Sequence, residues 1–281
     1  MFRFILTFLL LFGCGQAPKA SSSARPYSSQ LASEYSSLVA TVQSEADQAS
    51  GWPSSHDCDG ALWAGEARAA GIESVRIEQA LQPDGRPTRR PLTDCPLSET
   101  SHSTSTDMQL GIILGLFASR DCHSLARLQA YAEDHKGEVG YPSDTLEDLA
   151  YTYVKPGTRT LLALTTEKSG MPGGKGSEPW RHLPIAYTKP PTDSTLHLSL
   201  LSLYVEKELG TFGVVNQHFA DSLCASNPED ALALAVCGRL REAAERVLSS
   251  DWTPPSYVRG SPNYLSVHKA FILYILLREG K

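Results

Sequence analysis

The sequence predicts an all-α protein, because helical periodicity dominates it and strand periodicity is rare. Few stretches alternate apolar and polar residues with a period of two, whereas many repeat apolar residues every three to four positions. Segments that are apolar almost all round alternate with more polar ones, as expected when buried helices pack inside exposed helices. The composition (281 residues, 41% hydrophobic, net charge −6) suits one large or two small domains and argues against a nucleic-acid partner, which usually needs a basic surface.

The N-terminal residues predict export to the bacterial cell envelope. Arg3 precedes the apolar run 4–12, which is too short to span a bilayer permanently and is typical of a signal peptide. The following Leu11-Phe12-Gly13-Cys14 resembles the bacterial lipobox, which implies a lipoprotein with palmitate at Cys14; an ordinary secretory signal is the alternative. Gly15 and Gln16 lack the Asp that retains lipoproteins at the inner membrane in enterobacteria, so we expect an outer-membrane anchor facing the periplasm or the cell surface.

We therefore expect residues 1–13 to be the signal peptide, 14–33 a flexible Ser-, Ala- and Pro-rich tether, and 34–281 the helical domain. The oxidising periplasm permits disulfides. Proximity in the sequence favours the pairs Cys58–Cys95 and Cys224–Cys237. Cys122 is then left over, and a buried, inert thiol is the interpretation that we prefer for it.

In the N-terminal half, the first expected helix covers residues 31–49, where apolar residues form one stripe. Helices at 59–70 and 73–81 follow, and the second ends before the turn-forming Pro83-Asp84-Gly85. Residues 82–102 are polar and Pro-rich, which indicates a loop. Residues 104–118 are apolar almost all round, which indicates a buried helix, and a more polar helix at 121–136 would cover it.

In the C-terminal half, weaker helical patterns cover residues 143–154 and 158–166. The segment 167–192 contains no convincing element, and a loop of this length is often functional. The remaining expected helices cover residues 193–209, 212–225, 228–238, 239–250 and 262–279. In the third of these, Asn227 to Asp230 would form the cap and first turn.

The apolar helices all begin with a similar set of polar residues. These are Asp59, Thr104 to Asp107, Asp193 to Thr195, and Pro262-Asn263. Simple N-capping is one interpretation, because Ser, Thr, Asp and Asn are the preferred capping residues. The other interpretation is a ring of buried helices inside polar ones, an α/α toroid, in which these ends would meet at one mouth.

This pattern resembles the six-hairpin α/α toroid fold of many glycoside hydrolases and polysaccharide lyases, over about residues 34–279. The residues that carry the resemblance are Trp52-Pro53, Asp59 to Glu66, Ser105 to Gly111, His197 and His268. The resemblance implies a general acid and a general base, usually Asp or Glu, in a groove at the N-terminal rim of the inner helices. The expected function is therefore cleavage of peptidoglycan glycan or another surface polysaccharide; a non-catalytic lipoprotein scaffold that binds a glycan or a protein is the alternative.

Three carboxylates are the catalytic candidates. A helix N-terminus stabilises the ionised form of a carboxylate, so Asp107 and Asp59 suit a general base. Glu66 lies two turns after Asp59, about 10 Å along the axis. Burial in an inner helix would raise the pKa of Glu66 and suit a general acid. A solvent-facing position beside Arg68 is the other interpretation.

The candidate substrate-binding residues are aromatic platforms for a sugar face, basic groups for an acidic sugar, and histidines for sugar hydroxyls. They are Trp52, Trp180, Arg89, Arg90, His56, His102 and His197. Solvated loop arginines and hydrogen-bonded core histidines are the alternatives. Without an HExxH, a paired CxxC or a clear His-x-His motif we expect no metal and no cofactor. A metal-dependent hydrolase built on His56, Asp59 and His102 is a third hypothesis, and we expect a monomer.

Overall fold

The computed structural model of the chain describes residues 27–53, 59–91, 104–140, 156–171, 193–258 and 262–280. Within these ranges the chain is mostly helical and contains no strand. Isolated β-bridges join Ala46 to Pro53 and Leu81 to Pro87. The all-α class predicted from the sequence is therefore confirmed for the described part of the protein.

Most helices lie where the periodicity predicts them, and two have the predicted bounds. They are α1 (Ser28–Ser44), α2 (Gly60–Ala69), the 3-10 helix η2 (Ile77–Ala80), α3 (Thr106–Ser119), α4 (Cys122–Asp134), α6 (Pro156–Lys168), α7 (Asp193–Leu209), α8 (Val214–Ser226), α9 (Ala231–Val236), α10 (Leu240–Leu248) and α11 (Pro262–Glu279). The helix expected at 143–154 lies outside the described residues.

Three of the boundaries that differ from the predictions change the interpretation of the chain. Helix α1 begins at Ser28, inside the segment expected to be a tether. The expected helix 73–81 is reduced to the single turn η2. Helix α9 begins at Ala231, because the Asp230 side chain caps it by accepting hydrogen bonds from the backbone N–H groups of Leu232 and Ala233. Residues 228–230 therefore precede that helix and do not form its first turn.

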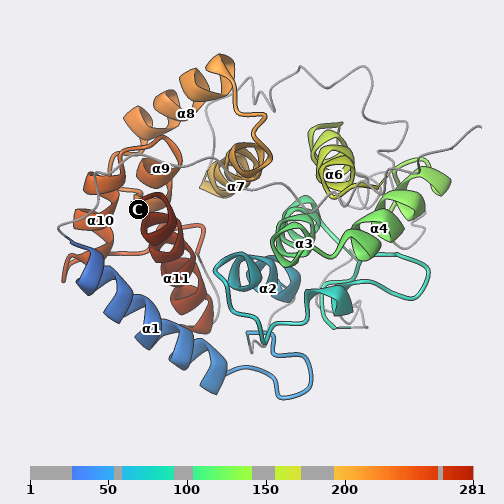
Figure 1. The fold of residues 1–281 in the computed structure, drawn as a ribbon, viewed down its shortest axis with the longest axis horizontal. Helices are drawn as coiled ribbons and strands as arrows, with labels where there is room; N and C mark the ends of the chain where they lie inside the picture. The colour runs from blue at the N-terminus through green and yellow to red at the C-terminus, as the bar shows by residue number, and fades with distance from the viewer. Residues whose placement is uncertain are drawn as a thin grey trace, which may run out of the picture.

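The most buried helices form a closed circuit of contacts. Helix α2 packs against α3, α3 against α7, α7 against α9, α9 against α11, and α11 against α2. The other helices cover this circuit: α1 lies on α11, α4 and α6 beside α3, α8 beside α7 and α9, and α10 beside α9 and α11 (Figure 1). The apolar helix α3 is buried continuously from Met108 to Leu116, as its sequence predicts.

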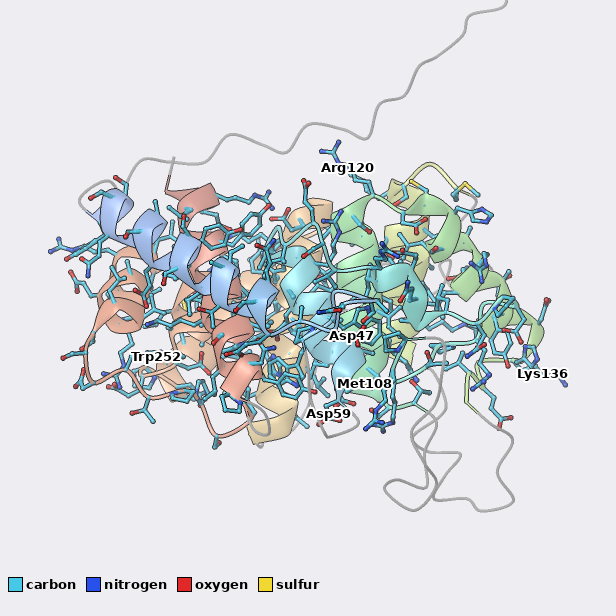
Figure 2. The ribbon with its side chains drawn as sticks, turned by 90° about the horizontal axis from the view of Figure 1, so that it is seen from below. Asp47, Asp59, Met108, Arg120, Lys136 and Trp252 are labelled. Carbon is cyan, nitrogen blue, oxygen red and sulfur yellow. A yellow bond between two sulfur atoms is a disulfide. The ribbon has the colours of Figure 1, made fainter. Side chains whose placement is uncertain are left out.

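Within the circuit, α2, α3, α7 and α11 run parallel, so their N-terminal ends share one end of the molecule. In α2 and α3, a Cβ atom at Gly111 would lie 2.5 Å from Leu62 Cα, and one at Gly115, a turn later, would lie 3.0 Å from Gly65 Cα, so the two helices advance in the same direction. Asp59 and Met108 mark the N-terminal ends of these two helices, whereas Arg120 marks the opposite end (Figure 2).

Helices α7 and α11 are also parallel. Their C-terminal ends meet through the ion pairs Lys207–Glu279 (Nζ to Oε2, 2.6 Å) and Arg278–Glu208 (Nη1 to Oε2, 2.9 Å). Earlier in the same two helices, the rings of Tyr204 in α7 and Phe271 in α11 pack edge to face. Among the described residues, no helix is both long enough and apolar enough to cross a membrane.

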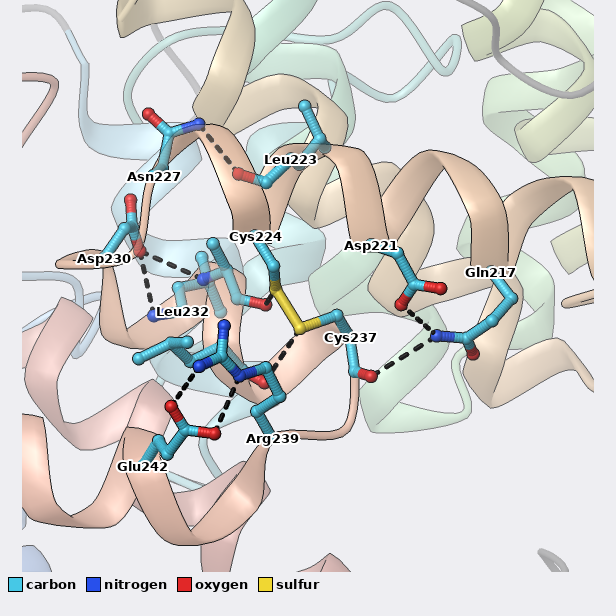
Figure 3. Close-up of a disulfide and its surroundings, with 12 residues drawn as sticks. Gln217, Asp221, Leu223, Cys224, Asn227, Asp230, Leu232, Cys237, Arg239 and Glu242 are labelled. Atoms are coloured by element: carbon cyan, nitrogen blue, oxygen red, sulfur yellow. Dashed lines mark hydrogen bonds and ion pairs between the residues drawn. A yellow bond between two sulfur atoms is a disulfide. The ribbon is translucent and has the colours of Figure 1, made fainter.

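One predicted disulfide is present. Cys224, near the end of α8, is bonded to Cys237, which ends α9 (Figure 3). Cys122 is free, as expected, but it is half-exposed and not buried, because it opens helix α4 at the surface. Cys58, Cys95 and the lipidation candidate Cys14 lie outside the described residues.

Candidate functional site

In the described part of the chain, Glu66, His197 and His268 form a cluster of ionisable side chains in the core. Glu66 lies in the second turn of α2, His197 in α7 and His268 in α11. His197 Nε2 lies 2.5 Å from Glu66 Oε1, and His268 Nδ1 lies 3.0 Å from Glu66 Oε2. Glu66 and His268 are 0% exposed and His197 is 3% exposed. Each imidazole therefore contacts a different oxygen of one buried carboxylate.

The cluster contradicts two expectations about Glu66. The residue does not face solvent beside Arg68, because α2 is an inner helix whose residues are nearly all buried. Its pKa is also not raised. Burial is the largest single influence and acts to raise it, but Coulomb attraction to His268 and His197, with a hydrogen bond from each, lowers the pKa to about 2. Glu66 is therefore ionised at neutral pH and is unsuited to be the general acid.

Aromatic rings surround the cluster. Trp63 stacks on His197 and on Tyr264, with ring centroids 5.6 and 4.9 Å apart, and Tyr257 stacks on the other side of His197 at 4.5 Å. The Tyr257 hydroxyl donates to Asp230 Oδ2 at 2.8 Å. Burial, followed by the charge and hydrogen bond of Asp230, raises the pKa of Tyr257 well above its usual value, so this phenol stays protonated.

Several polar atoms near the N-terminal ends of the buried helices lack hydrogen-bond partners among the described residues. These atoms are Trp63 Nε1, Thr104 Oγ1, both amide atoms of Gln109, and His268 Nε2. Buried polar groups in native proteins are almost always paired, and each exception costs about 1–3 kcal/mol. Such atoms, in or just before the first two turns of α2, α3 and α11, point to a polar ligand, ordered water or an ion at this end.

The rim residues at this end do not behave as simple caps. Asp59 occupies the N-cap position of α2 but makes no capping bond, and its Oδ1 lies 3.4 Å from Arg89 Nη1. Ser105 occupies the N-cap position of α3 without capping it and donates its hydroxyl hydrogen bond to Asp107 Oδ1. By contrast, Asp121 and Asp230 do cap α4 and α9. Helix capping alone therefore does not explain why polar residues occupy positions 59 and 105.

The other predicted site residues fall into three groups. Trp52 is 2% exposed and donates its indole N–H to the Arg76 carbonyl, so it is a core residue and cannot stack on a sugar as it stands. Arg89 is 6% exposed, so it is not the solvated loop charge that was the alternative, while Arg90 is half-buried. The candidates outside the described residues are His56, His102 and Trp180.

A separate pocket of about 470 Å³ lies at the opposite end of the circuit, at the C-terminal ends of α2, α3, α6, α7 and α11. Basic side chains line it, together with Glu73, Glu208 and Tyr204. The basic residues are Arg68, Arg120, Lys168 and Arg278. No residue of this pocket was predicted as a site residue, because solvated charges at helix ends carry no distinctive sequence signal.

Sequence patterns also did not indicate that Tyr257, Asp230 and His268 belong to the site. A signal for the histidines exists in the sequence. Glu66 and His268 each lie six residues after the first residue of their helix, and His197 lies four after it. At 1.5 Å per residue these positions are about 6–9 Å deep. In parallel helices, similar depths bring such residues together.

Comparison with known proteins found no matching family model, no similar curated protein and no similar solved structure. The geometry of the site therefore carries the functional argument.

Proposed function

We propose that this protein is an envelope-anchored carbohydrate-active enzyme, a glycoside hydrolase or lyase, that works at the N-terminal end of its buried helices. The observation that carries the proposal is the concentration of polar side chains at that end. The Glu66–His197–His268 cluster, the unpartnered atoms of Trp63, Thr104, Gln109 and His268, and the rim carboxylates Asp59 and Asp107 all lie in or just before the first two turns of parallel inner helices.

The architecture supports this proposal. We infer that α2, α3, α7, α9 and α11 are the inner helices of an α/α toroid, because their contacts close on themselves and the more exposed helices lie outside them. Such a ring brings helix N-termini to a common mouth, where oriented N–H groups stabilise anions and ionised carboxylates.

Within this proposal, Asp107 is the general base. It lies in the first turn of α3, is half-buried, and accepts a hydrogen bond from Ser105. Asp59 holds Arg89 at the same rim, where the guanidinium can pair with the carboxylate of an acidic sugar. Glu66 is assigned no acid role; it holds His197 and His268 in fixed orientations beneath the rim.

The substrate in this proposal is peptidoglycan glycan or another surface polysaccharide, and the membrane is reached through the N-terminal lipid. Export is supported by the signal-like N-terminus and by a disulfide between Cys224 and Cys237, since disulfides persist in oxidising compartments.

The test is turnover of isolated peptidoglycan and of acidic and neutral polysaccharides by the purified full chain, with reducing ends and unsaturated sugars measured separately. Removing a general base lowers the rate about 10²–10⁴-fold. The turnover of Asp107→Asn should therefore fall at least about 100-fold, while its circular dichroism stays unchanged. Asp221→Asn, on the exposed face of α8, is the matched control and should retain full turnover. Equal turnover in the two variants would exclude Asp107 as the base.

A non-catalytic binding lipoprotein is the second candidate, favoured by the basic pocket at the C-terminal ends of the inner helices. Saturable binding of an acidic glycan that is weakened by Arg68→Gln, together with no product from any substrate, would favour this second candidate over the enzyme.

A further inference from the structure

The Glu66–His197–His268 cluster has the geometry of a metal site. Taking one ligand atom from each residue, the three atoms lie within 4.8 Å of one another. Ligand atoms bound about 2.0–2.2 Å from a Zn²⁺ ion lie roughly 3–4 Å apart. Small side-chain rotations on three rigid helices would therefore suffice to place an ion between them.

The charge of the cluster also calls for a cation. The Glu66 carboxylate is fully buried, and in the described part of the chain its partners are the two imidazoles, with no lysine or arginine among them. A buried charge is costly unless it is paired or coordinates a metal. A divalent ion held between the three side chains would compensate the buried carboxylate.

The rings around the cluster also suit a metal site. Trp63, Tyr257 and Tyr264 form an aromatic shell around the cluster, and Trp63 and Tyr264 are buried. Metal sites typically combine such an apolar shell with fixed ligand orientations.

We propose that Glu66, His197 and His268 bind one divalent transition-metal ion per chain, with Zn²⁺ as the favoured ion. Two imidazoles and one carboxylate form a donor set that suits Zn²⁺ and Fe²⁺ and is poorly suited to Mg²⁺ or Ca²⁺, which prefer oxygen ligands. The inference does not depend on the proposed glycan-cleaving function, because metal binding can be measured without any substrate.

The experiment measures Zn²⁺ binding by the purified full chain after treatment with a chelator, in competition with a chromophoric chelator. Because all three ligands are buried, loading should be faster when the protein refolds with Zn²⁺ than when Zn²⁺ is added to the folded chain. We expect one Zn²⁺ per chain and a rise in Tm with Zn²⁺ concentration. Less than one ion per ten chains after refolding with excess Zn²⁺ would overturn the proposal.

The variant His268→Gln should weaken Zn²⁺ binding at least 100-fold. His218→Gln is the matched control, because His218 is exposed on α8, and it should bind Zn²⁺ as the wild type does. Equal affinity in both variants would place the ion elsewhere and contradict the proposal.

Spectroscopy separates binding at this cluster from a mere loss of folding. Co²⁺ bound by two imidazoles and a carboxylate should give visible absorption bands in the wild type that disappear in His268→Gln. Co²⁺ should also quench the emission of Trp63, whose ring stacks on His197. Full-strength bands without loss of tryptophan emission would locate the ion away from the cluster and refute the assignment.

Discussion

At the residue scale, two buried glutamates show how neighbours decide the state of a carboxyl group. Glu66 has two imidazole partners and its pKa falls to about 2, whereas burial raises the pKa of Glu206 to about 7. Glu206 accepts a hydrogen bond from the Asn216 side chain, but that neutral amide does not outweigh burial. The first carboxyl is ionised at neutral pH, and the second is partly protonated.

The substitution Glu206→Gln should stabilise the protein in a pH-dependent way. In the wild type, the unfolded chain ionises Glu206 near pH 4.5 while the folded chain retains the proton up to about pH 7. The folded state therefore loses stability as the pH rises from 4.5 through 7. We expect the variant to exceed the wild type by about 3 kcal/mol at pH 8 and by little at pH 4. Chemical denaturation at both pH values measures this, and a difference independent of pH would contradict the explanation.

At the element scale, glycines set the distance between α2 and α3. Gly65 and Gly111 face each other so closely that any side chain would meet backbone atoms. A Cβ atom at Gly111 would lie 2.5 Å from Leu62 Cα. The spacing Gly111-x-x-x-Gly115 places both glycines of α3 on the same face, one turn apart, as in other closely packed helix pairs.

Gly65→Ala should therefore force the two helices apart. We expect the free energy of unfolding to fall by about 3 kcal/mol or more, because backbone atoms cannot move aside as a flexible side chain does. Gly213→Ala is the control: its Cβ atom would meet nothing within 4 Å, and we expect a change of about 1 kcal/mol or less. Similar losses in both variants would argue against the close approach of α2 and α3.

The disulfide is also an element-scale feature, because it joins α8 to the end of α9. Its cysteines are 13 residues apart. Closing a loop of about this length stabilises a protein by roughly 3 kcal/mol. The double variant Cys224→Ser/Cys237→Ser should lose about that much in chemical denaturation, while Cys122→Ser should be unchanged. A double variant as stable as the wild type would show that the bond adds no stability.

At the scale of the whole molecule, the Glu66 cluster connects segments that are far apart in the chain. His197 is 131 residues from Glu66 and His268 is 202 residues from it. The three side chains therefore join α2, α7 and α11 across the circuit of buried helices. Loss of this cluster should weaken the fold as a unit.

Glu66→Ala, measured with a chelator present, should reduce the free energy of unfolding by about 3–5 kcal/mol, because it leaves buried polar groups uncompensated. The loss should be the same by circular dichroism and by tryptophan emission, since the cluster spans the molecule. Glu73→Ala, at an exposed position, should change stability by less than about 0.5 kcal/mol. A loss seen by only one of the two probes would mean that the cluster stabilises a local region.

The fold class and most helix positions could be predicted from the sequence, because they depend on local periodicity. Helices such as α3 and α11 are apolar all round and had to be buried wherever they packed. The disulfide Cys224–Cys237 was predictable for the same local reason, since its cysteines are close in the sequence. The bounds of α9 could not be predicted in this way. The Asp230 side chain accepts hydrogen bonds from two backbone N–H groups, so the helix begins only after Asp230.

What the sequence by itself determined is therefore the set of buried and exposed helices. What only the tertiary structure decided is which polar residues meet. Glu66, expected at the surface or as an acid, is an ionised carboxylate because His197 and His268 reach it from distant helices. Trp52, expected at a binding site, packs in the hydrophobic core, where its indole N–H donates to the Arg76 carbonyl oxygen. Such pairings depend on how parallel helices align side by side, and no local pattern in the chain specifies that alignment.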